Sequence, residues 1–369
     1  MAVAAVRFVY RAIGDGVVAL IDEIQDAPVF VRLLILFTIG VLTKMSLFWS
    51  DVQWIYEDTN WLPVTTLTNW RAPYVLSYLL STFGFGTPVG HHALNLAIHG
   101  IISVLVGSIG ARLWQSSPAG WAAGTLFWLN TMAIPAIGYA TAIQEMCVAL
   151  GACLAAWILI RGWTWYGVLA AAVVIGMTLL VKTSAIGVAL VPLLMLIVRP
   201  VEWRVSIGWV LAVAFIGFIW IYDFILAGLA KRPPYNWVLW PEEMLSQSAH
   251  ALRFAWTAAL PFQVTFQLDW QPYWIGCLAL VAIAIVTAEA LASRLMAPAE
   301  SFAVLWIVVV IGVRLIIPST IWPERAPELM YVHQFYPALP GMIWLLVSLG
   351  RRWIHSCYPV PTFPEGSSI

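Results

Sequence analysis

Charge is scarce in this sequence: only 10% of its 369 residues are Asp, Glu, Lys or Arg. The 18 basic and 18 acidic residues give a formal net charge of +0, so no bulk field favours nucleic acid as a partner. Metal-ligand spacings, phosphate-cradling glycine loops and nucleophile elbows are all missing from the sequence. Its cysteines lie mostly in apolar segments and predict small core residues, not a disulfide framework: Cys147, Cys153, Cys277 and Cys357.

Apolar residues dominate instead. They make up 62% of the chain, and the mean hydropathy is +0.88, well above the composition of soluble domains. Several runs exceed the ~18 residues that span a bilayer, and a backbone in lipid must satisfy its own hydrogen bonds. The sequence therefore predicts an all-α polytopic membrane protein with about ten transmembrane helices. We expect them at 30–49, 91–113, 119–136, 144–161, 165–181, 184–198, 205–228, 272–294, 301–318 and 331–350.

The segments outside these spans have their own patterns. Residues 1–28 are interrupted by acidic residues, which argues against a cleaved signal peptide, and their helical apolar spacing predicts an amphipathic helix on the cytoplasmic surface. Residues 29–350 then form the transmembrane domain and 351–369 a cytoplasmic tail. Segment 71–85 is apolar but short, and Gly84, Gly86 and Pro88 break it, so we expect an interfacial or re-entrant helix there.

The distribution of Lys and Arg predicts the orientation. Short turns on one side are rich in Arg, which places both termini in the cytoplasm. The opposite face then collects most of the acidic residues and two long loops, at about 50–90 and 229–271. Both loops are rich in Trp, Pro and Asn, and they predict ordered caps on the membrane domain. Function is therefore expected on this outer face.

A tight cluster of ionisable residues lies between Trp54 and His99, and such residues next to lipid tend to mark function. The cluster begins with Glu57 and Asp58, just after the first expected span. A partly desolvated carboxylate there can act as a general base toward a hydroxyl acceptor, or can bind a divalent cation. The alternative is a charge pair at a helix N-terminus or in a solvated loop.

The same cluster continues with Arg71 and a histidine-rich helix. His92, Asn95 and His99 stand at positions i, i+3 and i+7, so they share one face of a helix. At the outer end of a span, such a face can cradle a phosphate or orient a polar head group. Hydrogen bonding between helices is the alternative, and we favour it for the deeper His99.

Further cations and aromatic residues lie near the outer face. Lys182, Arg314 and Arg325 can meet a lipid phosphate; snorkelling to headgroups is the alternative, and we favour it for any one of them. Trp61 and Trp70 belong to a group of outer tryptophans that can stack on sugar rings. An ordinary interfacial aromatic belt is the alternative for that group, and we favour it.

The order of these motifs resembles that of the GT-C superfamily of polytopic glycosyltransferases. The chain is most similar to the membrane half of the tetratricopeptide-bearing O-mannosyltransferases and their bacterial relatives. The specific block is 55–99, which contains Ile55-Tyr56-Glu57-Asp58, Trp70-Arg71-Ala72-Pro73, and Gly90-His91-His92-Ala93-Leu94-Asn95 with His99. Weaker similarity covers Leu126–Glu145, Leu180–Thr183 and Tyr331–Gly341.

This resemblance implies a membrane enzyme with a lumenal or periplasmic active site, and we expect a bacterial inner membrane with the active face in the periplasm. It implies a polyprenyl-phosphate sugar as donor and a hydroxyl group as acceptor. Glu57 or Asp58 then corresponds to the catalytic base, and Arg71, His92 and Lys182 correspond to residues that organise the donor or the loops. Membrane lipids and other membrane proteins are the further partners implied.

The chain also departs from the family pattern. Asn130-Thr131 replaces the usual His-Pro, no second glutamate follows it, and Thr183 replaces the glutamate of a Lys-Glu pair. Ala72 interrupts the Arg-Pro pair. These losses leave open a second hypothesis, a catalytically inactive GT-C-like subunit of a larger membrane complex. A transporter is a weaker hypothesis, because transporters place ionisable groups near the midplane.

Overall fold

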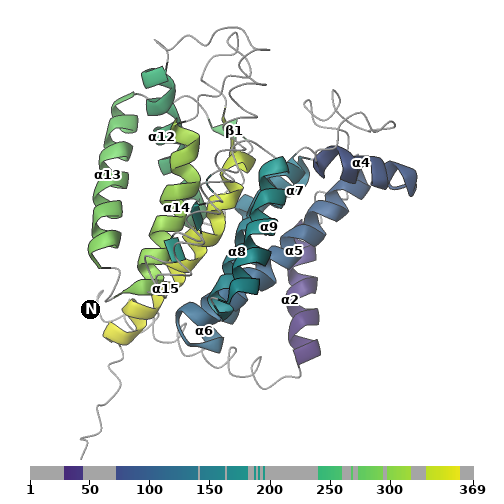
Figure 1. The fold of residues 1–369 in the computed structure, drawn as a ribbon, viewed down its shortest axis with the longest axis horizontal. Coiled ribbons are helices and arrows are strands. Elements are labelled where there is room, and N and C mark those ends of the chain that lie inside the picture. The colour runs from purple at the N-terminus through teal and green to yellow at the C-terminus, as the bar shows by residue number, and fades with distance from the viewer. Residues whose placement is uncertain are drawn as a thin grey trace, which may run out of the picture. The chain divides into compact units, whose positions relative to one another are not determined.

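The computed structural model describes residues 29–44, 72–139, 142–162, 164–181, 240–259, 267–268, 273–293, 297–316 and 330–357, with short stretches at 187, 190–191 and 194–195 (Figure 1). The regular secondary structure of these residues is helical apart from one two-residue strand pair, in which β1 (Gln267–Leu268) runs antiparallel to β2 (Met330–Tyr331). The expectation of a helical fold is confirmed.

The chain divides into two units, residues 1–49 and 50–369. The first contains α2 (Val29–Lys44), in which Thr43 Oγ1 donates a hydrogen bond to Gly40 O at 2.8 Å. The second contains α4 (Ala72–Thr82), α5 (Pro88–Leu113), α6 (Ser117–Leu129), η2 (Thr131–Ala133), α7 (Ile134–Gly138), α8 (Ile143–Arg161), α9 (Trp165–Val181), α12 (Trp240–Ala259), α13 (Tyr273–Ala292), α14 (Pro298–Ile316), η8 (Val332–Ala338) and α15 (Leu339–Cys357).

Three described helices are long and apolar enough to cross a membrane: 88–113, 143–161 and 274–292. They match the expected spans 91–113, 144–161 and 272–294. Shorter apolar helices cover 165–179 and 298–312. The expected span 205–228 and most of 184–198 lie outside the described residues.

Two expected spans have different boundaries in the structure. The expected helix 119–136 is wrong, because α6 ends at Leu129 and the chain continues as η2 and α7. The break lies at Asn130, whose extended backbone and side-chain cap end one helix and begin the next. The expected span 331–350 begins as the 3-10 helix η8, which contains Pro337, and becomes α-helical only at Leu339.

The second outer loop, expected at 229–271, contains a 20-residue helix, α12. This helix packs against α13 and α14 and joins the bundle. Its buried face is largely polar, which lowers its hydropathy below that of a typical span. The described part of the first loop, residues 72–90, forms α4 and the turn into α5. The sequence did not predict a bundle helix in the second loop, and residues 50–71, 229–239 and 260–266 lie outside the described residues, so the prediction of ordered caps stays a prediction.

Small residues allow neighbouring helices to approach closely. On α5 and α6, Ser103, Gly107, Gly120 and Gly124 face one another, and Ser103 Oγ donates to Gly124 O at 2.8 Å. A Cβ added at Gly120 would lie 2.5 Å from the Cβ of Ala111. Such contacts are typical of helix pairs in membranes, where van der Waals packing replaces the hydrophobic drive.

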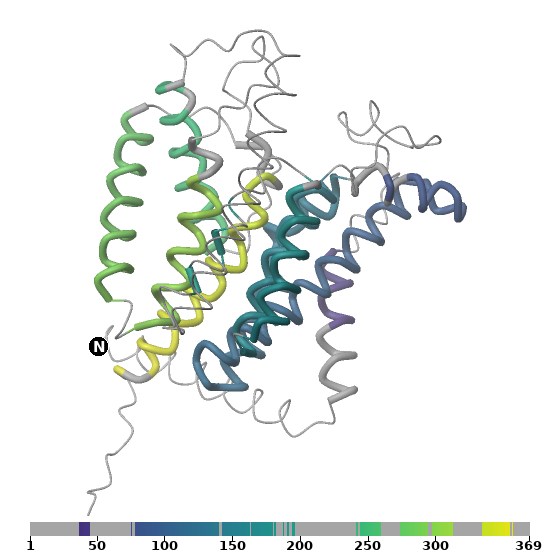
Figure 2. Tube along the Cα trace, viewed as in Figure 1, coloured from purple at the N-terminus to yellow at the C-terminus, as the bar shows by residue number. Residues whose placement is uncertain are grey.

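An aromatic cluster joins the later helices, which lie side by side in Figures 1 and 2. Trp306 of α14 and Trp344 of α15 are fully buried and meet edge to face, with ring centroids 5.1 Å apart. Trp344 Nε1 donates to Val106 O of α5 at 3.0 Å, and Trp306 Nε1 donates to Pro337 O at 2.9 Å. Each indole therefore has a partner for its only polar group.

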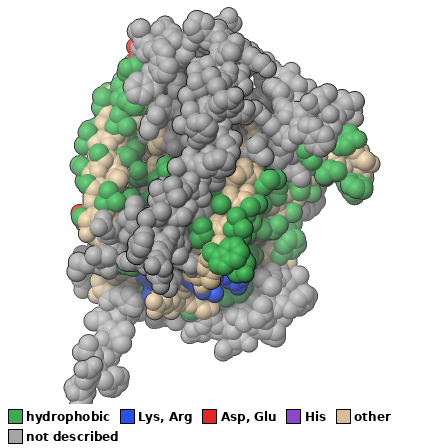
Figure 3. Space-filling model, viewed as in Figure 1, with side chains coloured by type: hydrophobic (Ala, Val, Ile, Leu, Met, Phe, Trp, Pro, Cys, Tyr) green, Lys and Arg blue, Asp and Glu red, His purple; other side chains and the backbone are tan. Residues whose placement is uncertain are grey.

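The outer surface of the described helices is strongly apolar (Figure 3). On α9, Leu169, Val173 and Met177 are exposed, and only 17% of the residues in the 274–292 segment are buried. Polar side chains such as Asn95 and His99 are buried instead. An apolar surface of this extent, together with helices of membrane-spanning length, indicates association with a membrane.

Candidate functional site

Of the residues singled out from the sequence, His92, Asn95, His99 and Arg314 lie in the described part of the chain. The first three are buried in the first half of α5. The others lie outside the described residues: Glu57, Asp58, Trp61, Trp70, Arg71, Lys182 and Arg325. The roles of these seven residues therefore stay predictions.

Helix α5 begins with a well-formed cap. Thr87 Oγ1 accepts a hydrogen bond from Gly90 N at 3.2 Å, and Pro88 occupies the first turn, where its missing N–H costs nothing. Beyond the cap, buried and exposed positions alternate with the helical period. His92, Asn95 and His99 are buried, whereas Ala93 and Ala97 between them are exposed. The prediction that the three polar residues share one face is confirmed.

This polar face binds the chain that follows α6. His92 Nδ1 donates to Ile137 O at 2.9 Å. Asn95 Nδ2 lies 3.3 Å from Ala136 O, 3.3 Å from Ile137 O and 3.0 Å from Tyr139 O. Helix α7 has only five residues, so its last carbonyls lack intrahelical partners, and the side chains of α5 supply donors to them.

The amide of Asn95 can be oriented without ambiguity. Three carbonyl oxygens surround one end of the side chain, so that end must be the donating NH₂ group. The oxygen Oδ1 is then fixed on the other side, fully buried, and in the structure it accepts no hydrogen bond.

His99 joins three elements one turn deeper. Its Nε2 donates to Trp128 O at 3.3 Å, so in the neutral ring Nδ1 accepts from the hydroxyl of Tyr336 at 2.7 Å. The imidazole also stacks on the Trp128 indole, with centroids 5.2 Å apart and planes 21° apart. These bonds are of the inter-helix kind that the sequence offered as the alternative for this residue.

Asn130 occupies the position where the resembled family has His-Pro. Its Oδ1 accepts from Met132 N at 2.9 Å, and its Nδ2 donates to Ala258 O of α12 at 3.2 Å. The side chain therefore caps η2 and attaches the end of α12 to the bundle. It is buried, with 3% of its surface exposed.

Glu145 lies in the first turn of α8 and is 2% exposed. The positive end of the helix dipole favours a carboxylate at this position. Helices α5 and α8 pack together and both begin near α4 and α7 (Figure 1). Glu145 and the His92–Asn95 pair therefore lie toward the same end of the bundle.

Sequence reasoning missed a buried polar face on α12. It assigned 240–259 to a loop, yet five polar side chains of this helix are buried: Ser246, Gln247, Ser248, His250 and Thr257. The available signal was the helical spacing of Ala251, Phe254 and Ala258, which are all buried. Phe254 stacks on Phe335 of η8, with centroids 5.2 Å apart, which holds this face toward the interior.

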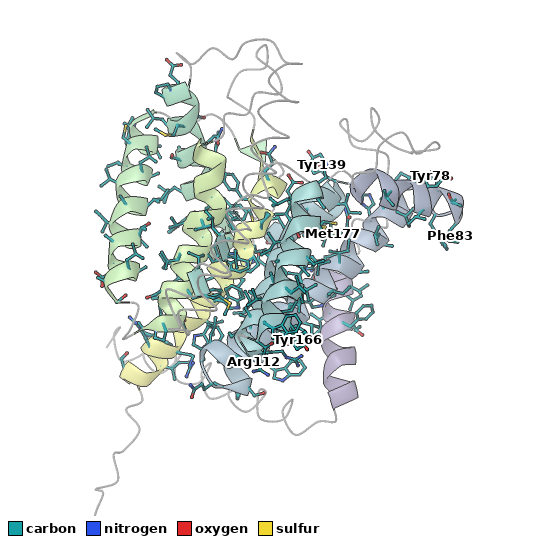
Figure 4. All side chains as sticks on the ribbon, viewed as in Figure 1. Tyr78, Phe83, Arg112, Tyr139, Tyr166 and Met177 are labelled. Carbon is teal, nitrogen blue, oxygen red and sulfur yellow. The ribbon has the colours of Figure 1, made fainter. Side chains whose placement is uncertain are left out.

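The opposite end of the bundle is basic. Arg112, Arg161, Arg351 and Arg352 lie at or near the C-terminal ends of α5, α8 and α15, and Figures 3 and 4 show this basic end and the position of Arg112. Arg161 lies over the Trp157 ring at 3.8 Å, and Arg351 lies 5.9 Å from the Trp114 ring centroid. Arg352 pairs with Glu300 at 3.1 Å.

Metal binding has no support from the described residues, among which no group of three His, Cys, Asp or Glu side chains could hold an ion. The possible cation site at Glu57 and Asp58 lies outside them. What the described part of the site offers is a rigid polar wall, made of buried amide, imidazole and carboxylate groups near the start of α5 and α8.

The chain matches no family profile, no curated protein and no solved structure.

Proposed function

We propose that this chain is a membrane glycosyltransferase of the GT-C type. In this proposal it transfers a sugar from a polyprenyl-phosphate donor to a hydroxyl acceptor on the extracytoplasmic face. Support comes from the order of motifs in 55–99 and from the membrane-length helix 88–113, which carries the last of these motifs. The membrane is a bacterial inner membrane, with both termini in the cytoplasm and the active face in the periplasm.

One observation carries the proposal. Arg71 directly precedes α4 in the chain, and α4 packs against α5, α8 and α9. Residues 72–99 of the motif block 55–99 thus contain both α4 and the part of α5 that carries the buried His92–Asn95 pair. The same α4 also contacts α8, the helix that begins near Glu145. Lys182 directly follows the last residue of α9, a helix that α4 also contacts. The described helices next to these motifs therefore pack together, which supports the proposal.

The proposed mechanism divides the work among these groups. Glu57 or Asp58 removes the proton of the acceptor hydroxyl, which then attacks the anomeric carbon and displaces the polyprenyl phosphate with inversion. Arg71, Lys182 and Arg325 neutralise the charge that develops on the departing phosphate. Trp61 and Trp70 stack on sugar rings, and His92 and Asn95 hold the wall against which the donor lies.

The basic end of the bundle supports the proposed orientation. Arginines gather in the cytoplasmic segments of membrane proteins, so the end with Arg112, Arg161 and Arg351 is assigned to the cytoplasm. The end where α5 and α8 begin is then assigned to the periplasm, where a flipped lipid-linked donor would be available.

A second candidate is favoured by the bonds of the polar residues themselves. His92, Asn95 and Asn130 all bind backbone carbonyls of this chain, which is what a retained scaffold without catalysis requires. In this alternative the chain is a non-catalytic GT-C-like subunit of a membrane complex. The lost second glutamate of the family pattern points the same way.

The test uses the full chain in nanodiscs with radiolabelled polyprenyl-phosphate mannose or glucose and cell-envelope acceptors. We expect Glu57→Gln or Asp58→Asn to lower transfer by roughly 10²–10⁴-fold, the usual range for loss of a general base. The melting temperature should not change. Glu242→Gln, an exposed carboxylate at the start of α12, is the matched control and should retain full transfer.

Unchanged transfer in both acidic variants would refute the proposed base. Absence of transfer in the native chain, together with no thermal stabilisation by polyprenyl phosphate, would favour the non-catalytic subunit. A stoichiometric complex purified from the native membrane would then identify its partners.

A further inference from the structure

The turn between α4 and α5 is unusually well defined. Gly84 adopts φ +79°, and its N–H binds Ser81 O at 3.1 Å while Phe85 N binds Leu80 O at 2.7 Å. This pair of bonds is a Schellman motif, which ends a helix and satisfies its last carbonyls. A side chain at Gly86 would collide with Ser81, and one at Gly90 with the Phe85 carbonyl. The turn therefore holds one rigid conformation.

This rigid turn presents apolar side chains to the outside. Phe83 is 71% exposed and Phe85 is 62% exposed, with Leu79 and Val89 exposed on either side. Residues 72–111 contain no Asp, Glu, Lys or Arg. Two exposed phenylalanines without a neighbouring charge are costly in water, because about 25 cal/mol is lost for each Å² of apolar surface left hydrated.

The exposed aromatic residues continue an apolar stripe on α5. On α5, Val89, Ala93, Ala97 and Ile101 follow one another at intervals of four residues, and all are exposed; Phe85, in the turn four residues before Val89, is exposed too. Residues separated by four positions line one side of a helix. Since α5 is long and apolar enough to cross a membrane, this exposed stripe is its lipid-facing side. The stripe leads without interruption to the turn.

The direction of α4 also favours contact with the membrane interface. Figure 1 shows α4 lying across the end of α5 instead of along it, and Figure 4 places Phe83 at the tip of α4 on the margin of the molecule. A short helix that lies crosswise at the end of a span is parallel to the membrane plane when the span crosses the membrane. Its tip then meets the boundary between headgroups and acyl chains.

We propose that Phe83 and Phe85 form an aromatic wedge that inserts into the acyl region of the bilayer and anchors α4 at the membrane interface. The occupant of this surface is lipid, because the wedge is continuous with the lipid-facing stripe of α5 and carries no charge that a protein partner would pair. This proposed membrane anchor does not depend on the chain having catalytic activity.

The fixed conformation of the turn makes insertion of Phe83 and Phe85 into the bilayer more favourable. Amphipathic elements at membrane surfaces bury their apolar side chains ~5–10 Å into the boundary region. A flexible loop would lose conformational entropy on insertion, whereas the Schellman turn has already fixed Phe83 and Phe85 in the inserting direction. The helix cap at Thr87 fixes the other side of the turn.

The test places a photo-crosslinking phenylalanine analogue at position 83 or 85 of the full chain, reconstituted in phosphatidylcholine–phosphatidylglycerol nanodiscs. The analogue is close to Phe in size, so the turn should be preserved. We expect lipid adducts, seen as a mass increase of one phospholipid. Position 278 on α13, native Leu278, is the positive control, and position 242 is the negative control. Crosslinks to protein alone would overturn the proposal.

A second measurement tests depth. Phe85→Cys is labelled with an environment-sensitive fluorophore, in a background in which Cys147, Cys153, Cys277 and Cys357 are replaced by alanine. Lipids with a nitroxide high on the acyl chain should quench this probe more than lipids with a nitroxide at the chain end. A label at Ile285→Cys, an exposed position near the middle of the 274–292 segment, should show the reverse order, and one at Glu242→Cys little quenching. Quenching at position 85 no greater than at position 242 would refute insertion.

Discussion

The buried polar residues at the start of α5 donate hydrogen bonds to backbone carbonyls. His92 and Asn95 donate to carbonyls of residues 136–139, which lie 41 to 45 positions along the chain. Residues 136, 137 and 139 are buried away from water, so the side chains of α5 supply the donors that their carbonyls need. Polar residues that resemble a catalytic motif thus also fix the connection between α6 and α8.

Asn95 provides the clearest test at this scale. Asn95→Leu removes the donor shared by three carbonyls, and we expect a loss of about 2 kcal/mol of unfolding free energy. Asn95→Asp should cost more, because it places acceptors against acceptors. Thr82→Ala, which removes an exposed bond to Tyr78 O, is the control and should stay within about 0.5 kcal/mol. Thermal unfolding in nanodiscs measures both, and a native-like Asn95→Leu would contradict the assignment.

The bond between His99 and Tyr336 is a second test. Tyr336→Phe removes the hydroxyl that donates to His99 Nδ1, and His99→Phe removes the acceptor. In a double-mutant cycle we expect a coupling of about 1 kcal/mol between the two positions. Tyr78→Phe combined with His99→Phe is the control pair, which should be additive. Additivity at Tyr336 would show that the bond contributes nothing to stability.

At the scale of elements, the closely packed helix pairs depend on glycine residues at their contacts. The α5–α6 pair meets at Gly107, Gly120 and Gly124, while Gly151 meets Thr178 between α8 and α9. Gly276 and Gly341 have the same role on α13 and α15, against Leu245 and Ala303. Close approach of backbones is therefore a general feature of this bundle.

Replacement of Gly120 by alanine should separate α5 from α6. The new Cβ would meet Ala111 Cβ at 2.5 Å and Gly107 O at 2.6 Å, and we expect a loss of about 1–3 kcal/mol. Gly176→Ala on α9 is the matched control, since nothing lies within 4 Å of its added Cβ. Better helix propensity should make that variant neutral or up to about 1 kcal/mol more stable. Equal melting temperatures for the two variants would contradict the packing.

At the scale of the whole molecule, the apolar surface and the basic end are the dominant features. Exposed Leu, Val and Ile on α9 and α13 indicate association with a membrane, and the arginines of α5, α8 and α15 distinguish one end from the other. Together they support the proposed orientation, which in turn determines the side on which the donor would be found.

Cysteine accessibility tests this orientation in intact cells. In the cysteine-free background, Glu242→Cys should react with a membrane-impermeant maleimide added outside. Arg161→Cys, at the end of α8, should react only after the membrane is permeabilised. Both positions are exposed, so the difference reports the side of the membrane and not burial. The reverse pattern would place the polar end in the cytoplasm and remove the proposed access to a periplasmic donor.

The sequence by itself determined the helical class, the positions of α5, α8 and the 274–292 segment, and the shared face of His92, Asn95 and His99. These properties are local, because an apolar run or a helical spacing can be recognised within about 20 residues. It did not predict the break at Asn130, since the flanking residues are apolar on both sides. It also missed α12, whose buried face mixes polar residues with Ala251, Phe254 and Ala258.

Only the tertiary structure decided what the polar residues bind. His99 and Tyr336 are 237 positions apart, and Asn130 reaches Ala258 across 128. The composition of a motif shows which groups can donate and accept, but packing selects the partner. The aromatic wedge follows the same rule: Phe83 and Phe85 read as part of one short apolar segment, and the fixed turn at Gly84 turns them outward, toward the lipid.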